Sequence, residues 1–234
     1  MYKKPFAIPF IGWILIGTIV PGLVIAFYGF TDRSGAFTMD NVTSILAPEH
    51  AKALWMSLLL AFISSLICLI ISLPLALILR NSKLSSKGFL VFIFILPMWM
   101  NFLLRTMAWQ VLLERGGLIN TFFENIGMPQ LQIINTPVAV VLGMVYDYLP
   151  FMILPIYNSM IKIENAVIEA AYDLGATKAK VFKDIILPLS VPGIASGITM
   201  VFVPALTTFA ISNMLGGGKI YLIGNIIEQE FTTT

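Results

Sequence analysis

Long apolar runs, separated by short polar or charged segments, dominate the pattern of residues along this chain. They lie at about residues 8–30, 54–79, 89–112, 137–160 and 191–214. An α-helix needs roughly 20 mainly apolar residues to cross the hydrocarbon core of a bilayer, and each run reaches that length. We therefore predict an all-α, polytopic bundle of five membrane-spanning helices, forming one transmembrane domain over residues 1–234.

The first run could be mistaken for a signal peptide, because Lys3 and Lys4 precede it. The apolar core of a signal peptide is about 7 to 15 residues long and is followed by a cleavage site with small residues. This run is longer and ends in Tyr28, Phe30 and Arg33. We interpret it as an uncleaved first helix.

Composition agrees with a membrane protein. Hydrophobic residues make up 58% of the chain and charged residues only 11%, whereas soluble domains contain roughly 25% charged residues. The net charge of +2 is too small to indicate a nucleic-acid partner. The single cysteine, Cys68, lies in an apolar run, so no disulfide or cysteine-based metal site is predicted and we expect this residue to be buried.

The distribution of lysine and arginine predicts the orientation in the membrane. Alternating spans place nine of these residues on one face and four on the other, namely Lys3, Lys4, Arg80, Lys83, Lys87, Lys162, Lys178, Lys180 and Lys183 against Arg33, Lys52, Arg115 and Lys219. Cytoplasmic loops carry the excess of positive charge. We therefore expect a cytoplasmic N-terminus and a cytoplasmic segment between the fourth and fifth spans.

That segment, residues 164–188, is helical and charged at once. Apolar side chains recur at helical spacing on one narrow face, formed by Val167, Ala170, Ala171 and Leu174. Another face carries Glu169 and Asp173. The pattern predicts a short helix that lies along a surface.

A second short helix is predicted to follow. Gly175 can adopt the positive φ that ends a helix, and Thr177 can cap the next one. That helix would bury Val181, Phe182 and Ile185.

The spacing of this segment resembles the EAA loop of ABC-importer permeases. The matching positions are Glu169, Ala170, Ala171, Gly175, Ile185, Leu187 and Pro188. The resemblance implies the fold of a type I ABC importer permease, with a cytoplasmic coupling helix that docks into a separate ATPase. The implied coupling residues are Glu169, Ala170, Ala171, Asp173 and Gly175.

The resemblance also implies the rest of a transport complex in the plasma or inner membrane of a bacterial cell. Its other members would be two copies of the ATPase, a second related permease and an extracytoplasmic solute-binding protein. The chain has no G-x-x-x-x-G-K-[ST] phosphate loop, so we expect ATP and Mg²⁺ to be used by the partner ATPase and no cofactor to be bound here. The chain itself is expected not to be an enzyme.

Further segments are similar to permeases that import spermidine and putrescine. They include LPMWMNFLLRTMAWQVLLERGGLIN from Leu96 to Asn120, and FVPALTTFAISNMLGGG followed by LIGN. Two positions depart from relatives. Asn165 stands where related chains often have proline, and we expect it to cap the coupling helix instead; Asn213 stands where some relatives have an acid.

Polyamines carry several ammonium groups, so their path needs carboxylates, carbonyls and aromatic faces. The candidate path residues are Trp99, Asn101, Trp109, Tyr146, Asp147 and Tyr148. An ionisable residue within a span usually faces a cavity or a partner, which favours a role for Asp147. Two alternatives stay open: Asp147 and Arg105 pair with each other, or the tryptophans belong to the membrane interface.

Other functions remain alternatives. The solute could instead be iron, an opine or another small molecule, or the chain could be a gradient-driven secondary transporter or channel. An enzyme has little support, because His50 is the only histidine and no metal set or nucleophile–base pair is visible. The family usually continues into a further helix after the fifth span, and we expect that helix to be absent from this chain.

Overall fold

The computed structural model describes residues 8–32, 34–81, 94 and 96–233. Within this part of the chain all regular secondary structure is helical, and one isolated bridge joins Thr31 and Phe37, as the prediction of an all-α bundle requires. The chain divides into two compact units, Met1–Lys52 and Ala53–Thr234, which are described separately.

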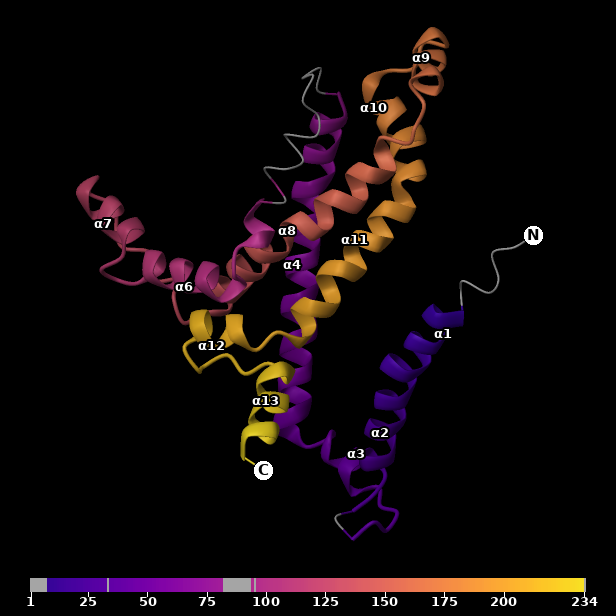
Figure 1. Cartoon of the computed structure of the whole chain (residues 1–234). Helices are drawn as coiled ribbons and strands as arrows, with labels where there is room; N and C mark the ends of the chain where they lie inside the picture. The colour runs from indigo at the N-terminus through magenta and orange to yellow at the C-terminus, as the bar shows by residue number, and fades with distance from the viewer. Residues whose placement is uncertain (1–7, 33, 82–93, 95, 234) are drawn as a thin grey trace. The chain divides into compact units, whose positions relative to one another are not determined.

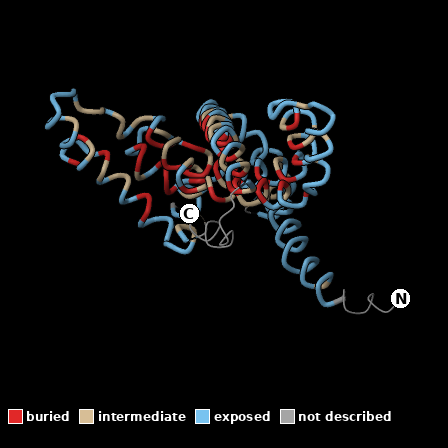
Figure 2. Tube along the Cα trace, turned by 90° about the horizontal axis from the view of Figure 1, so that it is seen from above, coloured by how far each residue is buried: buried red, intermediate tan, exposed pale blue. Residues whose placement is uncertain are grey.

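The first unit contains one apolar helix and a small turn structure. α1 (Ile8–Ile14), a π-helical turn (Leu15–Ile19) and α2 (Val20–Gly29) follow one another, and Pro9–Gly29 is long and apolar enough to span a membrane. Figure 2 shows this helix as exposed along its length, and α2 has no buried residue. Its apolar side chains are therefore available to lipid or to another protein. α3 (Asp40–Ser44) completes the unit.

Three further helices in the described residues meet the same criterion of length and hydropathy. They are α4 (Pro48–Asn81), α8 (Pro137–Met160) and the continuous helical stretch Lys178–Thr207, which comprises α10 (Lys178–Val181), a π-helical turn (Phe182–Ile186) and α11 (Leu187–Thr207). α8 coincides with the fourth predicted span. α9 (Asn165–Asp173) lies between α8 and α10 and forms the tip of the second unit in Figure 1.

Small residues on α4 face the core of the second unit. Buried small residues recur at intervals of three or four residues, as one face of a helix requires, and include Ser57, Ala61, Ser64, Cys68, Ser72 and Ala76. Small side chains let helix backbones approach closely within a membrane. Cys68 is free and buried, as predicted.

α8 and α11 lie side by side (Figure 1) and make the most extensive helix–helix contact among the described residues. Gly193 makes this approach possible, since a Cβ atom there would lie 2.5 Å from the Pro155 carbonyl oxygen. Around this contact Met152, Ile153 and Ile156 of α8 are buried in the core.

The third predicted span, 89–112, falls partly outside the described residues. Its described part is interrupted rather than continuous: a 3₁₀ turn (Leu96–Trp99) precedes α6 (Phe102–Leu113). Asn101 has φ −57° and ψ 125°, outside the helical region, and its side chain accepts a hydrogen bond from the Leu103 N–H. The residue acts as a helix cap, which explains the break. α7 (Leu118–Asn125) follows α6.

The fifth predicted span, 191–214, is likewise divided. α11 ends at Thr207, and α12 (Ala210–Gly216) begins after Thr208, whose ψ of 137° is extended. α13 (Ile223–Thr233) follows. Hydropathy alone predicted one helix here because the residues on both sides of the break are apolar.

Candidate functional site

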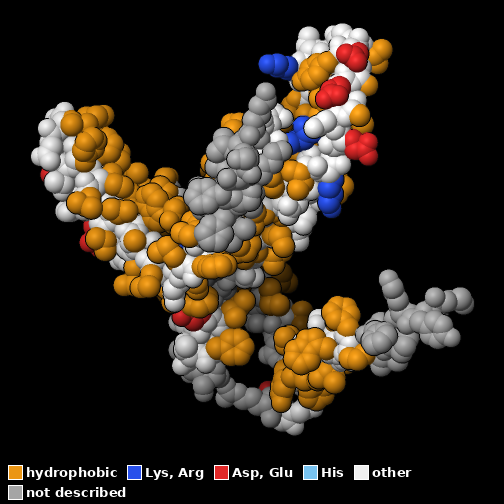
Figure 3. Space-filling model, turned by 45° about the horizontal axis from the view of Figure 1, so that its top comes forward, with side chains coloured by type: hydrophobic (Ala, Val, Ile, Leu, Met, Phe, Trp, Pro, Cys, Tyr) orange, Lys and Arg blue, Asp and Glu red, His pale blue; other side chains and the backbone are white. Residues whose placement is uncertain are grey.

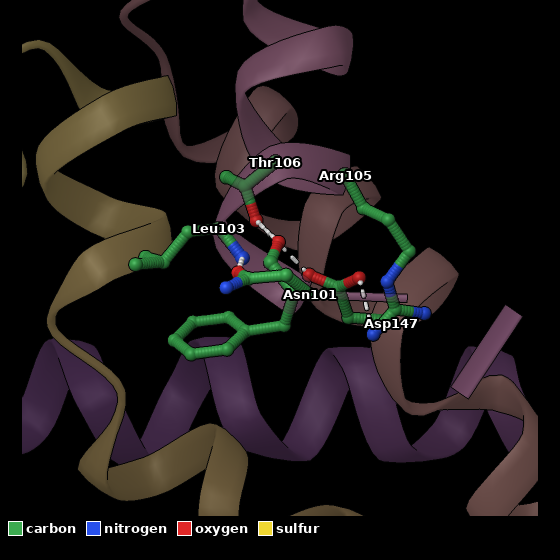
Figure 4. A network of polar contacts seen from close by, with 6 residues as sticks. Asn101, Leu103, Arg105, Thr106 and Asp147 are labelled. Atoms are coloured by element: carbon green, nitrogen blue, oxygen red, sulfur yellow. Dashed lines mark hydrogen bonds and ion pairs between the residues drawn. The ribbon is translucent and has the colours of Figure 1, made fainter. Parts of the chain in front are cut away.

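A buried polar cluster joins α6 to α8. The Asp147 side chain is 2% exposed, and its Oδ1 lies 3.3 Å from Nη2 of Arg105. Thr106 Oγ1 donates a hydrogen bond of 3.1 Å to Asp147 Oδ2. Figure 4 shows both α6 side chains directed at the carboxylate. Of the alternatives left open by the sequence, the structure therefore shows that Asp147 and Arg105 pair.

This ion pair is incompletely hydrogen-bonded. Nε and Nη1 of Arg105 and Oδ1 of Asp147 are buried and make no hydrogen bond within the described residues. A buried ion pair repays the cost of desolvation only when its remaining donors and acceptors are satisfied. The cluster thus keeps hydrogen-bonding capacity that the described residues do not use.

Aromatic side chains lie beside the ion pair. The rings of Trp109 and Tyr146 meet edge to face with their centroids 5.4 Å apart, and Arg105 Cζ lies 5.9 Å from the centroid of Tyr146. Both rings also line an open hollow of about 350 Å³, whose other walls are apolar residues of α4 and α8. The aromatic faces are therefore accessible at the edge of the cluster.

The other predicted path residues do not join this cluster in the same way. Trp99 is 77% exposed in the 3₁₀ turn, and the side chain of Asn101 is used to cap α6. Tyr148 points toward α11, where its hydroxyl donates a hydrogen bond of 3.4 Å to the Pro204 carbonyl. The structure thus brings Asp147, Tyr146 and Trp109 together around Arg105.

The second region of interest is the segment around α9. Its packed side differs from the predicted apolar face: Ile168 and Ala171 contact the core, whereas Val167 is 45% exposed and Leu174 is 89% exposed. α9 lies between α8 and α10, and apolar spacing alone does not specify which side of the helix meets the core. Ala170 is also exposed, so α9 presents an apolar surface outward.

The turn after α9 follows the prediction. Gly175 has φ +83°, a conformation that favours glycine. The Thr177 side chain accepts a hydrogen bond from the Lys180 N–H and caps α10. Val181 is buried as expected, and Phe182 and Ile185 are partly buried against the same core.

Charged side chains gather around this turn. Figure 3 shows Lys, Arg, Asp and Glu side chains at the end of the second unit that carries α9 and α10. Glu169 and Asp173 are exposed there, as are Lys178, Lys180 and Lys183. Such a surface is suited to water or to a polar protein partner and not to the bilayer core.

Arg80, which the sequence placed only among the basic residues of one membrane face, binds the segment where α9 begins. Its Nε donates to the Met160 carbonyl at 2.9 Å, and its Nη2 donates to the Ile163 carbonyl at 3.0 Å. Nη2 also lies 3.1 Å from Oδ1 of Asn165.

Asn165 is therefore not the helix cap that was expected. Glu164 occupies the capping position and makes no side-chain bond there, while the Asn165 side chain accepts from Arg80. Because Arg80 is 85 residues away from Asn165, no local pattern could have revealed this contact.

Comparisons with known proteins agree on one family. The family model described as binding-protein-dependent transport system inner membrane component matches residues 72–233. The chain is 37% identical over 227 residues to the spermidine/putrescine transport system permease protein PotB of Haemophilus influenzae, covering 94% of this chain and 79% of the relative. It is 38% identical over 229 residues to PotB of Escherichia coli K12, covering 94% of this chain and 83% of that relative.

A solved structure shares the fold. It is the bacterial alginate ABC transporter in complex with alginate pentasaccharide-bound periplasmic protein, matched with a TM-score of 0.76 at 19% identity. The match covers 96% of this chain and 81% of the transporter chain.

Proposed function

The chain belongs to the family of binding-protein-dependent transport system inner membrane components, and we propose that it couples a separate ATPase to the import of spermidine or putrescine. The observation that carries the coupling role is the exposed apolar surface of α9, held between α8 and α10 by the turn at Gly175. A short helix of this kind can seat in a cleft of a partner and transmit its movement to the spans on either side.

The coupling residues have distinct roles in this proposal. Ala170 is exposed, and its small side chain allows a close approach of the ATPase surface, whereas Ala171 is partly buried and its small side chain lets α9 lie close to the core. Glu169 is exposed and can pair with a basic residue of that partner. Asp173 lies at the end of α9 and adds a second acid to the surface. Gly175 sets the direction in which the chain leaves the docked helix.

The remaining parts of the complex follow from the family. We propose two copies of an ATPase, which bind ATP and Mg²⁺ themselves, a second related permease and an extracytoplasmic solute-binding protein. The alginate transporter described in complex with a periplasmic protein supports the last of these. The nine-to-four distribution of basic residues supports a cytoplasmic N-terminus in a bacterial inner membrane.

The polar cluster supports a polyamine as the solute. An ammonium group needs a carboxylate or the face of an aromatic ring, and a cation–π contact contributes roughly 0.5–2 kcal/mol. Asp147, Tyr146 and Trp109 supply these groups together. Trp99, Asn101 and Tyr148 are further candidates along the path. The relatives named as spermidine/putrescine permeases support the same solutes.

The test is polyamine-stimulated ATP hydrolysis by the reconstituted complex with its binding protein. The unaltered chain is compared with one that carries Glu169→Lys and Gly175→Leu, and co-purification of the ATPase is recorded in parallel. We expect the altered chain to insert in the membrane but to lose both ATPase binding and stimulation.

Two outcomes would contradict the proposal. If the altered chain keeps full stimulation, α9 is not the coupling element. If the unaltered complex hydrolyses ATP faster with another solute and its binding protein but not with spermidine or putrescine, the polyamine assignment is wrong and the coupling role stands.

A further inference from the structure

We propose that Arg80 is the positioning residue that makes α4 move together with the coupling helix α9; this inference rests on the proposed coupling role of α9. Arg80 is at the end of α4, one residue before the last of that helix. Its partners belong to the C-terminus of α8, to the connection after it and to the first turn of α9. One side chain therefore joins three helices.

The contacts of Arg80 are hydrogen bonds to neutral oxygen atoms and include no ion pair within the described residues. In the part of the chain that the structure describes, the only salt bridge is that between Arg105 and Asp147, whereas the guanidinium of Arg80 donates to two backbone carbonyl oxygens and to the amide oxygens of Asn165 and of its own neighbour Asn81. The carbonyls at a helix C-terminus lack partners within the helix and carry partial negative charge. The planar guanidinium binds the Met160 carbonyl at this C-terminus and the Ile163 carbonyl in the connection from fixed directions, which the single ammonium of lysine cannot do.

The connection held by Arg80 is short. Only residues 161–164 separate α8 from α9, and Ile163 in their midst is buried. With the Met160 and Ile163 carbonyls and the Asn165 side chain fixed to α4, little freedom is left for α9 to turn independently. Packing reinforces the link, because Leu79 of α4 and Ile168 of α9 belong to the same apolar cluster.

This arrangement defines how force would pass through the chain. α9 is covalently continuous with α8 before it and with α10 and α11 after it, but it reaches α4 only through space. A cavity of about 410 Å³ lies beside the contact and is lined by Arg80, Asn165 and Glu169, among others. Packing next to the Arg80 side chain is thus incomplete. The hydrogen bonds of Arg80 are the polar contacts that join α4 to the start of α9 here.

The experiment compares Arg80→Ala, Arg80→Lys and Asn165→Ala in the full reconstituted complex, with Arg115→Ala as the matched control because Arg115 is an exposed arginine. The measured quantities are polyamine uptake, ATP hydrolysis and ATPase co-purification in the same vesicles. We expect Arg80→Ala to keep the ATPase bound but to raise the ATP hydrolysed per polyamine imported by about tenfold, the order expected for losing hydrogen bonds to a charged group.

The two milder variants should give ratios of ATP to polyamine between those of the unaltered chain and Arg80→Ala. Arg80→Lys keeps the charge but lacks the planar guanidinium, and should still raise the ATP hydrolysed per polyamine imported several-fold. Asn165→Ala removes one of the hydrogen bonds of Arg80 and should raise this ratio less. Arg115→Ala should equal the unaltered chain.

A distance measurement separates positioning from general stability. In a chain whose only cysteine is replaced by Cys68→Ala, spin labels are attached through Ile78→Cys in α4 and Leu174→Cys after α9, both exposed positions. We expect a narrow distance distribution with Arg80 and a broad one with Arg80→Lys.

The results that overturn the inference are specific. An unchanged ratio of ATP to polyamine in Arg80→Ala excludes the role, and so does full rescue by Arg80→Lys together with an unchanged distance distribution. Should Arg80→Ala fail to assemble, Arg80→Lys and Asn165→Ala decide the matter by the same ratio. If the unaltered complex shows no coupling at all, the proposed function fails first, and this is seen independently of any Arg80 variant.

Discussion

The pair Asp147–Arg105 has a structural role and a proposed functional one, and single substitutions alone cannot separate them. Asp147→Asn leaves the charge of Arg105 buried without its partner, which typically costs about 3–5 kcal/mol. Both roles predict loss of uptake from this variant. The double variant Asp147→Asn with Arg105→Gln removes both charges and keeps hydrogen-bonding groups, so its stability should return close to that of the unaltered chain.

Uptake by the double variant is therefore decisive. We expect the thermal unfolding temperature to recover while spermidine uptake stays at least tenfold reduced, because no carboxylate is left for the ammonium group. Uptake and unfolding of both variants are measured on the same preparations. Recovery of uptake together with stability would show that the pair is only structural.

Gly175 offers a second prediction for a single residue. Its φ of +83° costs other residues about 1–2 kcal/mol, although no atom lies within 4 Å of a Cβ placed there. Gly175→Ala should therefore weaken ATPase binding about 5- to 30-fold through the backbone alone, measured by titration of the ATPase against the permease in nanodiscs.

The control variants for Gly175→Ala are chosen by the φ angle of the substituted position. Gly175→Asn should be milder because Asn tolerates the left-handed region. Gly116→Ala, at a glycine with equal space but no positive φ, should leave binding unchanged. Equal binding by all three variants would show that the turn does not set the direction of α9.

How far the sequence predicts these residues depends on the range of the interaction. Gly175 and Thr177 were predictable because a turn and a cap are decided within a few residues. The contact between Arg80 and Asn165 was not, because 85 residues separate the partners. Asp147 was singled out by its cost within a span, yet only the structure shows that Thr106 binds it as well.

At the scale of elements, the close contact of α8 with α11 depends on Gly193. A Cβ atom there would lie 2.5 Å from the Pro155 carbonyl oxygen and from Ser159 Cβ, and backbone atoms cannot move aside as a flexible side chain can. Gly193→Ala should separate the helices and destabilise the chain by about 1–3 kcal/mol, seen as a lower unfolding temperature in scanning calorimetry.

Two other glycines serve as comparisons for the loss of stability expected from Gly193→Ala. Gly197→Ala should cost less, because the nearest atom is the flexible Sδ of Met152 at 2.8 Å. Gly22→Ala in α2, where nothing lies within 4 Å, should not destabilise the chain. An equal loss at positions 22 and 193 would mean that the helix contact is not what Gly193 protects.

The same scale shows why helix breaks were missed. Hydropathy identifies segments that can lie in a membrane, but it does not register a change of backbone direction within an apolar segment. The extended ψ at Thr208 and the cap at Asn101 both interrupt such segments. Asn101, which the sequence marked as a candidate for the solute path, also has the local role of a cap.

For the whole molecule, orientation is the property on which every proposal depends. α11 has 21 residues, about 30 Å of helix, which matches the thickness of the hydrocarbon core. The α9–α10 turn lies before this helix and the α12–α13 turn after it, so the two turns should be on opposite faces of the membrane. The excess of basic residues predicts that the first turn faces the cytoplasm.

Single cysteines test this assignment directly in a Cys68→Ala background. Leu174→Cys reports on the first turn and Tyr221→Cys on the second, and both native side chains are exposed at 89% and 54%. A membrane-impermeant maleimide added to intact cells should label only position 221, and permeabilised cells should be labelled at both. Labelling of position 174 in intact cells would place α9 outside the cell, where no ATP-driven partner could dock, and would contradict the coupling role of α9 and Arg80 together.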